Sequence, residues 1–220
     1  GDVAIVTVNP HGKVNPVRPN MQQDHESRLP HLTALIGSGL VDVVVCPECW
    51  LDDGGRRSVA SYLKSSGNQV KGFVAPTSSC VCTMEERPDT AKIAQSVSGG
   101  VLILLSPSLA ARVRDVKTFC SGRVLVLSLT RDGLPPLHIV AVYGVSSPTQ
   151  NPNKKALARE VYQVIDQLIR ELGQDALIIT GDFNTVWRSE DRVGDVFEPY
   201  DHNVSAIPPL LQGAGMRDCH

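Results

Sequence analysis

The side chains with the clearest chemical potential lie in the stretch Leu177-Ile178-Ile179-Thr180-Gly181-Asp182-Phe183-Asn184. A short apolar run ends in a glycine turn, which presents the carboxylate of Asp182 and, two residues later, the carboxamide of Asn184. A carboxylate can act as a general base or bind a metal ion, and a carboxamide can supply a fixed oxygen acceptor or amide donor. Hydrolysis of a phosphate ester needs such groups close together, so this stretch predicts that reaction class.

Three more apolar segments end in polar side chains that suit phosphate chemistry, namely Asn9, Glu48 and Tyr143. If these strands lie side by side in one sheet and point the same way, the three side chains converge with Asp182 at one edge, where ligand sites often form. Each residue alone is more typical of a turn, a helix cap or the solvated edge of a core than of a functional site. The recurrence at four strand ends is what favours a site.

The elements that would carry these residues follow from hydrophobic periodicity. Apolar, β-branched runs predict strands at 3–8, 41–46, 70–75, 101–105, 124–129, 137–142 and 176–180. Helical spacing predicts helices from about residue 27 to Gly37, over 59–63 and over 154–172. The last of these has Asn153 as its expected N-cap and Gly173 just beyond its end. We expect 124–129 and 137–142 to pair antiparallel across Arg131-Asp132-Gly133.

Length and composition indicate one globular domain over residues 1–220. The chain is 42% hydrophobic and 20% charged, and its formal net charge of −2 argues against a sequence-independent polycationic surface for nucleic acid. It does not exclude nucleic acid as a substrate, because a site that gathers carboxylates around a metal lowers the net charge. With no run of 18 apolar residues and no signal-peptide pattern, we expect an intracellular protein without a membrane span.

The cysteines allow two interpretations. Cys46 and Cys49, together with Cys80 and Cys82, supply four thiols that could bind zinc. Alternatively, they are small buried hydrophobic residues in a reducing compartment. The second interpretation is favoured, because the spacing between the two pairs is long and the second pair is Cys-x-Cys.

Taken in order, the strand-end motifs resemble those of the endonuclease/exonuclease/phosphatase superfamily, which has the fold of pancreatic deoxyribonuclease. The similar blocks are Thr7-Val8-Asn9, Val43-Val44-Val45-Cys46-Pro47-Glu48, Ser98-Gly99-Gly100-Val101, Val142-Tyr143, Gly181-Asp182-Phe183-Asn184 and Gly215-Met216-Arg217-Asp218. The segments Glu190-Asp191-Arg192 and Leu210-Leu211-Gln212-Gly213-Ala214-Gly215 are most similar to endonuclease domains of non-LTR retrotransposons. The resemblance implies a four-layered α/β sandwich of two packed mixed sheets flanked by helices.

The resemblance also implies a role for each site residue. Glu48, helped by Asn9, would bind Mg²⁺, for which Mn²⁺ can substitute, and Asp182 would deprotonate the attacking water. Asn184 would fix Asp182 or the phosphate, and Tyr143 would donate a hydrogen bond to a phosphate oxygen. Asp218 would orient a catalytic histidine.

That histidine belongs to a Ser-Asp-His motif with which the family continues. The sequence ends at His220, which does not lie in such a motif. We therefore expect a C-terminally truncated domain that lacks its last strands and its catalytic histidine. The exposed sheet edge that this leaves would be a liability.

The resemblance favours a metal-dependent DNA endonuclease that nicks target DNA for a non-LTR retrotransposon. It would act in the nucleus, as part of a polyprotein with a reverse transcriptase, and Arg188 and Arg192 are the best candidates for backbone phosphate contacts. One alternative keeps the fold and changes the substrate: an abasic-site repair nuclease, an RNA deadenylase or a phosphoinositide phosphatase. Another is an inactive fragment that serves as a binding module or is a remnant.

Overall fold

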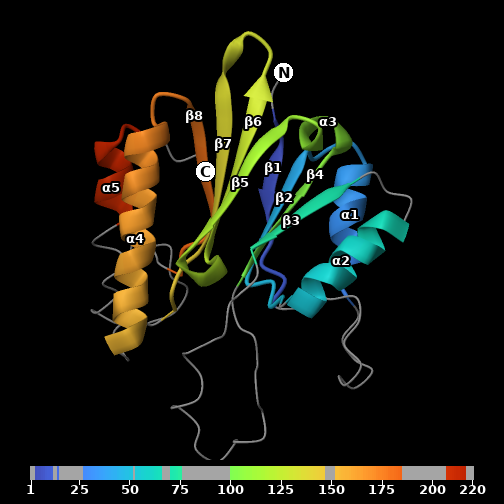
Figure 1. Ribbon diagram of the computed structural model, residues 1–220, viewed down its shortest axis with the longest axis horizontal. Helices are drawn as coiled ribbons and strands as arrows, with labels where there is room; N and C mark the ends of the chain where they lie inside the picture. Colours follow the sequence, from blue (N-terminus) through green and yellow to red (C-terminus); the bar gives the residue numbers. More distant parts are fainter. Residues whose placement is uncertain are drawn as a thin grey trace, which may run out of the picture.

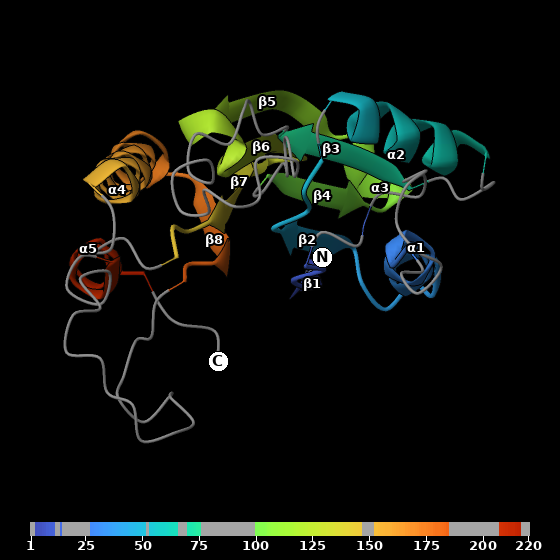
Figure 2. The same cartoon turned by 90° about the horizontal axis from the view of Figure 1, so that it is seen from below.

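The fold consists of two β-sheets packed face to face, each covered on its outer side by helices (Figures 1 and 2). This computed structural model describes residues 3–11, 14, 27–51, 53–65, 70–75, 100–146, 152–184 and 207–216. Viewed along the layers, α4 and α5 lie outside one sheet, while α1 and α2 lie outside the other. The expected four-layered α/β sandwich is confirmed.

The first sheet has the strand order β1-β2-β4-β3. Its strands are β1 (Ile5–Thr7), β2 (Val43–Pro47), β3 (Lys71–Ala75) and β4 (Val101–Leu105). β1 and β2 are parallel, whereas β4 runs antiparallel to both of its neighbours, β2 and β3. β1 and β2 therefore direct their carboxyl ends, and the residues that follow, to the same edge.

The second sheet has the order β5-β6-β7-β8. Its strands are β5 (Val113–Phe119), β6 (Val124–Arg131), β7 (Leu134–Tyr143) and β8 (Ala176–Asp182). β6 and β7 form the expected antiparallel pair, and β7 and β8 are parallel with Tyr143 opposite Asp182. The carboxyl ends of β7 and β8 thus also share one edge.

The central strands are buried on both faces, which explains their nearly continuous apolar sequences. In β2, Val43 and Val45 pack between the sheets, whereas Val44 and Cys46 face the helices. The outer faces are covered by α1 (Leu29–Gly37) and α2 (Asp53–Ser65) on one side and by α4 (Pro152–Leu172) and α5 (Ile207–Gly213) on the other. The core between the sheets fixes their relative position, and therefore that of the strand ends.

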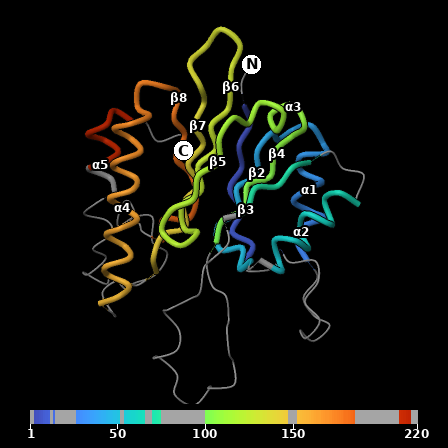
Figure 3. The backbone as a smooth tube through the Cα atoms, viewed as in Figure 1, coloured from blue at the N-terminus to red at the C-terminus, as the bar shows by residue number. Residues whose placement is uncertain are grey.

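The strands that carry the site belong to two sheets, so the single-sheet condition of the strand-end argument is not met. Hydrophobic runs identify strands but not their partners, and here β1 and β2 pair with each other, as do β7 and β8. The four ends still converge because the two sheets are stacked. Figure 2 shows β1 and β8, far apart in sequence, at the same side of the sandwich, and Figure 3 traces both strands by colour. Their edges are joined by the Oγ1 atoms of Thr7 and Thr180, 2.6 Å apart.

Smaller differences concern element boundaries. Asn153 lies inside α4, which begins at Pro152, because proline is well suited to a first helical turn. The strand β5 and the short helix α3 (Pro107–Ala110) were not expected from the sequence. Residues 78–95 lie outside the described part of the chain. Among the helices that the structure describes, none has both the length and the apolar character needed to cross a membrane.

Candidate active site

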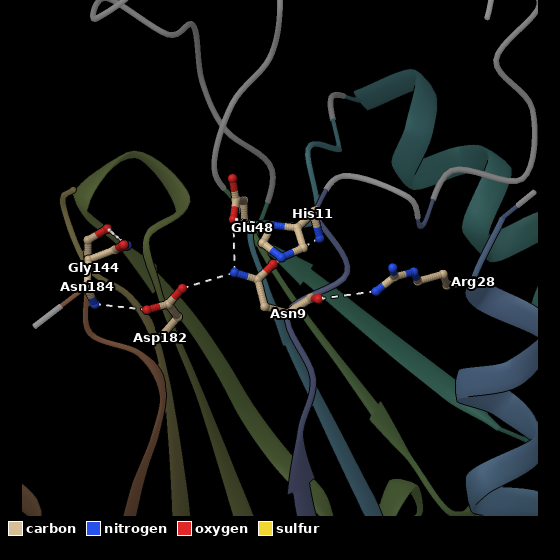
Figure 4. A network of polar contacts seen from close by, with 7 residues as sticks. All are labelled: Asn9, His11, Arg28, Glu48, Gly144, Asp182 and Asn184. Atoms are coloured by element: carbon tan, nitrogen blue, oxygen red, sulfur yellow. Dashed lines mark hydrogen bonds and ion pairs between the residues drawn. The ribbon is translucent and has the colours of Figure 1, made fainter. Parts of the chain in front are cut away.

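The four strand ends meet around the carboxamide of Asn9, which follows β1. Its Nδ2 donates to Glu48 Oε2 at 2.9 Å and to Asp182 Oδ2 at 3.0 Å (Figure 4). Glu48 follows β2 in one sheet, and Asp182 ends β8 in the other. One amide group therefore holds two carboxylates from different sheets side by side.

Glu48 is presented by a tight, unusual backbone. Its φ of 56° is left-handed, which is uncommon for a residue other than glycine. The chain behind it is anchored by the hydrogen bond from Cys49 N to Gly100 O at 3.2 Å. The carboxylate remains 19% exposed, so ions and substrates in solution can reach it.

Asp182 and Asn184 form a local hydrogen-bonded turn. The backbone N–H of Asn184 donates to Asp182 Oδ1 at 2.9 Å, while Asp182 Oδ2 accepts from Asn9. The side chain of Asn184 turns to the neighbouring strand, where its Nδ2 donates to Gly144 O at 3.0 Å. Both oxygens of Asp182 are thus fixed, and Asn184 holds the carboxylate through its backbone rather than through its side chain.

Two glycines permit the close approach of β7 and β8 at this point. A Cβ on Gly181, whose φ is 141°, would overlap the carbonyl oxygen of Val142. A Cβ on Gly144 would overlap the carbonyl oxygen of Phe183. The short bond from Gly144 N to Asp182 O, 2.6 Å, closes the gap. Neither position can accept a side chain without separating the strands.

Tyr143 ends β7 among the buried residues between the sheets. Burial raises the pKa of its phenol to about 12, with the negative charge of Glu48 adding to the effect and Arg123 opposing it. The phenol is therefore protonated at neutral pH and is a hydrogen-bond donor beside the two carboxylates.

Arg123, which lies immediately before β6, fixes the end of β7. Its guanidinium lies 4.8 Å from the centre of the Tyr143 ring, a cation–π distance. Its Nη1 also donates to Gly144 O at 2.9 Å and to Tyr143 O at 3.3 Å. Gly144 O thus accepts from both Arg123 and Asn184, which connects the tyrosine to the Asp182 turn.

The sequence-based site is largely brought together in the structure. Asn9, Glu48, Tyr143 and Asp182 meet as the strand-end argument requires, and Asn184 lies directly behind Asp182. Asp218 and the arginines Arg188 and Arg192 lie outside the described residues.

Two contributors were missed by sequence reasoning, Arg123 and His11. Arg123 lies in the turn just before β6, where no sequence pattern marks it. His11 lies among the turn-forming residues Asn9-Pro10-His11-Gly12, which indicate only a turn. The one available signal was position, since His11 comes two residues after Asn9.

The side chains at this edge have the chemistry needed to bind an ion such as Mg²⁺. Mg²⁺ takes one or two protein carboxylates and fills its remaining positions with water and phosphate oxygens. Glu48 and Asp182 offer such carboxylates at an accessible edge. Asn9 directs its N–H groups at both of them, and its Oδ1 accepts from His11 N at 2.9 Å, so the carboxamide oriented this way organises the carboxylates. No three His, Cys, Asp or Glu side chains of the described residues form a complete protein-only metal site.

The two cysteines beside Glu48 are free and fully buried. Burial raises the pKa of Cys46, with Cys49 adding to it, and burial raises the pKa of Cys49 to about 12. This agrees with their interpretation as small hydrophobic residues. The zinc alternative also needs Cys80 and Cys82, which are outside the described residues.

Comparison with solved structures identifies the fold. The chain is similar to the 3′ phosphatase NExo from Neisseria bound to a product DNA hairpin, with a TM-score of 0.58 and 18% identity over 86% of this chain. It is also similar to the APE2 catalytic domain of Xenopus laevis, with a TM-score of 0.62 and 14% identity over 93% of this chain. A third similar structure is an AP endonuclease from Archaeoglobus fulgidus, with a TM-score of 0.57 and 12% identity over 96% of this chain.

These similarities establish the fold of the chain, the DNase-like α/β sandwich of these neighbours, which is the fold that the resemblance implied. The chain spans 61% of the Neisseria protein, 66% of the Xenopus domain and 70% of the Archaeoglobus protein. It thus covers less than two thirds of the first two. Neither a scan against protein-family models nor a search of curated proteins gives a match.

Proposed function

We propose that this protein is a divalent-metal-dependent phosphodiesterase that cleaves DNA. The observation that carries the proposal is the carboxamide of Asn9 between Glu48 and Asp182, at the end of a DNase-like sandwich. Two carboxylates held side by side, with a protonated phenol beside them, supply a metal ligand, a base and a hydrogen-bond donor for one phosphate. The DNA hairpin bound to the similar NExo protein supports DNA as the substrate class.

Each residue has a distinct part in this proposal. Glu48 would hold the ion, and Asn9 keeps Glu48 and Asp182 side by side. Asp182, whose position Asn9 and Asn184 fix, takes the proton from the attacking water. The phenol of Tyr143 donates to a phosphate oxygen as negative charge develops. Bound Mg²⁺ supplies a Lewis acid that polarises the phosphodiester and stabilises the leaving oxygen. Mn²⁺ is expected to substitute.

The most direct test is nicking of supercoiled plasmid by the purified chain. With Mg²⁺ we expect open-circular product, and with EDTA none. Glu48→Gln should lose activity with Mg²⁺, because it removes the charged ligand. Stable DNA binding without any nicking, in Mg²⁺ or Mn²⁺, would instead indicate a binding module and would overturn the proposal.

The finer assignment is an endonuclease that nicks chromosomal target DNA for a non-LTR retrotransposon, from a polyprotein that also carries a reverse transcriptase. It is supported by the sequence similarity around Glu190 and Leu210, and it implies a nuclear location. Nicking at a preferred sequence in undamaged duplex is the expected result. Nuclear location can be tested by imaging the tagged chain in cells.

A second candidate keeps the same site and changes the substrate. The similar proteins include a 3′ phosphatase and an AP endonuclease, which favours processing of damaged DNA as the alternative. A panel containing undamaged duplex, duplex with one abasic site and a hairpin with a 3′-phosphate separates the two. Faster turnover of the damaged substrates would favour repair over target nicking.

A further inference from the structure

His11 is held in a strained conformation that turns its ring toward the site. It follows Asn9 and Pro10 with a φ of 47°, a left-handed value uncommon for residues with a side chain. Its backbone N–H donates to Asn9 Oδ1 at 2.9 Å, so the residue that holds the two carboxylates also fixes His11. Figure 4 shows the imidazole beside Glu48, on the solvent side of Asn9. Strain retained at such a position is common at functional sites.

The distance between His11 and Glu48 suits two ligands of one cation better than a direct hydrogen bond. His11 Nδ1 lies 3.4 Å from Glu48 Oε2. A good N–H···O hydrogen bond is about 2.7–3.2 Å long. Two ligand atoms that each lie about 2.1 Å from one ion are about 3.0 Å apart at a right angle and about 3.4 Å apart at a tetrahedral angle. The pair is therefore long for a hydrogen bond and well spaced for two ligands of one cation.

We propose that His11 Nδ1 is a metal ligand in addition to Glu48, and that it makes the site favour a first-row transition ion over Mg²⁺. This rests on the proposed function, because Glu48 is the metal-binding residue in that proposal. Imidazole nitrogen suits first-row ions such as Fe²⁺, Ni²⁺ and Zn²⁺, whereas Mg²⁺ prefers oxygen ligands. Mn²⁺, the first-row ion with the weakest preference for nitrogen, serves as the paramagnetic probe. The His11 side chain is 67% exposed, so the ring is open to an ion from solution.

Pulsed electron paramagnetic resonance of the full chain with Mn²⁺ tests the proposal without any measurement of activity. A nitrogen bound directly to Mn²⁺ gives a characteristic ¹⁴N coupling, which we expect in the wild type. His11→Gly should remove the coupling and weaken Mn²⁺ binding by at least about 10–100-fold, the loss typical even for a residue that only orients a metal ligand. Mg²⁺ binding, measured by competition, should change less than about twofold because Mg²⁺ depends on oxygen ligands.

Two further variants control the experiment. Glycine adopts the φ of His11 without strain, and His11→Asn, which also tolerates that conformation, should likewise remove the coupling. His31→Ala changes an exposed histidine on α1 and should leave both the coupling and the affinity unchanged.

Bound Mn²⁺ without ¹⁴N coupling in the wild type, or coupling that persists in His11→Gly, would overturn the proposal. If Glu48→Gln still abolishes binding in that case, the proposed function survives. If the ¹⁴N coupling depends on His11 but the chain nicks no DNA, the assignment of His11 as a metal ligand is supported and the proposed nuclease function is rejected.

Discussion

Asn9 lies between two carboxylates that belong to different sheets. It uses both N–H groups of one carboxamide for this, and its oxygen holds the backbone of His11. Loss of this side chain would leave Glu48 and Asp182 without their common partner, and their mutual repulsion would no longer be opposed. The residue therefore acts on the relative position of the two groups on which the proposed chemistry depends.

We expect Asn9→Ala to lower the rate of DNA nicking by about 10–100-fold. Hydrogen bonds to charged groups contribute about 1.5–3 kcal/mol, and each 1.4 kcal/mol is a factor of ten in rate. Gln167→Ala is a matched control, because that carboxamide also donates to a carboxylate, Glu171 at 2.7 Å, but on the exposed face of α4. Single-turnover nicking rates check the expectation, and equal rates for the two variants would contradict it.

At this scale the convergence of Asn9, Glu48, Tyr143 and Asp182 could be predicted from the sequence because these residues end or follow buried strands, and strand ends gather at sheet edges. It could not predict Arg123 or His11. The role of Arg123 depends on the pairing of β6 with β7, which brings it beneath Tyr143. That of His11 depends on a left-handed turn that directs its ring to Glu48. Both are set by tertiary contacts that no local pattern records.

At the scale of elements, the close approach of β7 and β8 controls the site. Tyr143 lies opposite Asp182 in the register, and the strands come together there because Gly144 and Gly181 have no side chains. The central strands were recognisable from their continuous apolar sequences. β5 was missed because most of its residues are exposed and polar, so it lacks that signal.

We expect Gly144→Ala and Gly181→Ala each to lower the free energy of unfolding by at least about 2 kcal/mol, because the new Cβ would overlap a carbonyl of the neighbouring strand. Gly37→Ala is the control. A Cβ at that position in α1 has no atom within 4 Å, and alanine is favoured over glycine in a helix by about 1 kcal/mol. Urea denaturation measures all three variants. Wild-type stability in the two strand variants would show that the strands can separate without cost.

At the scale of the whole molecule, the site exists because two sheets are stacked. The core between them, which includes Ile103 of β4 and Ile139 of β7, holds the β1–β2 and β7–β8 ends together. The sequence indicated the strands and their order along the chain. Hydrophobic pattern alone could not indicate which strands pair in which sheet, because pairing is decided by packing over long range, and the two sheets were expected only from the family resemblance.

The same packing should protect the thiols beside Glu48. Burial raises the pKa of Cys49 to about 12 and raises that of Cys46 as well, so both are protonated at neutral pH. We expect alkylation by iodoacetamide at pH 7.5 to be at least about 100-fold slower in the native protein than in urea, since the thiolate is the reactive form. Mass spectrometry of the peptide that contains both residues measures this. Rapid labelling of the native chain would contradict this expectation, because it would mean that the thiols at the end of β2 are accessible to solvent.

The central claim is that Asp182 is the base of a DNA-cleaving site, and single-turnover plasmid nicking by Asp182→Asn tests it most directly. Asp132→Asn is the matched control, an almost fully exposed carboxylate paired with Arg112 away from the site residues. Removal of a general base typically costs about 10²–10⁴-fold in rate. We therefore expect a loss of that size for Asp182→Asn, with a cooperative unfolding transition retained, and a wild-type rate for Asp132→Asn. Wild-type nicking by folded Asp182→Asn would contradict the account.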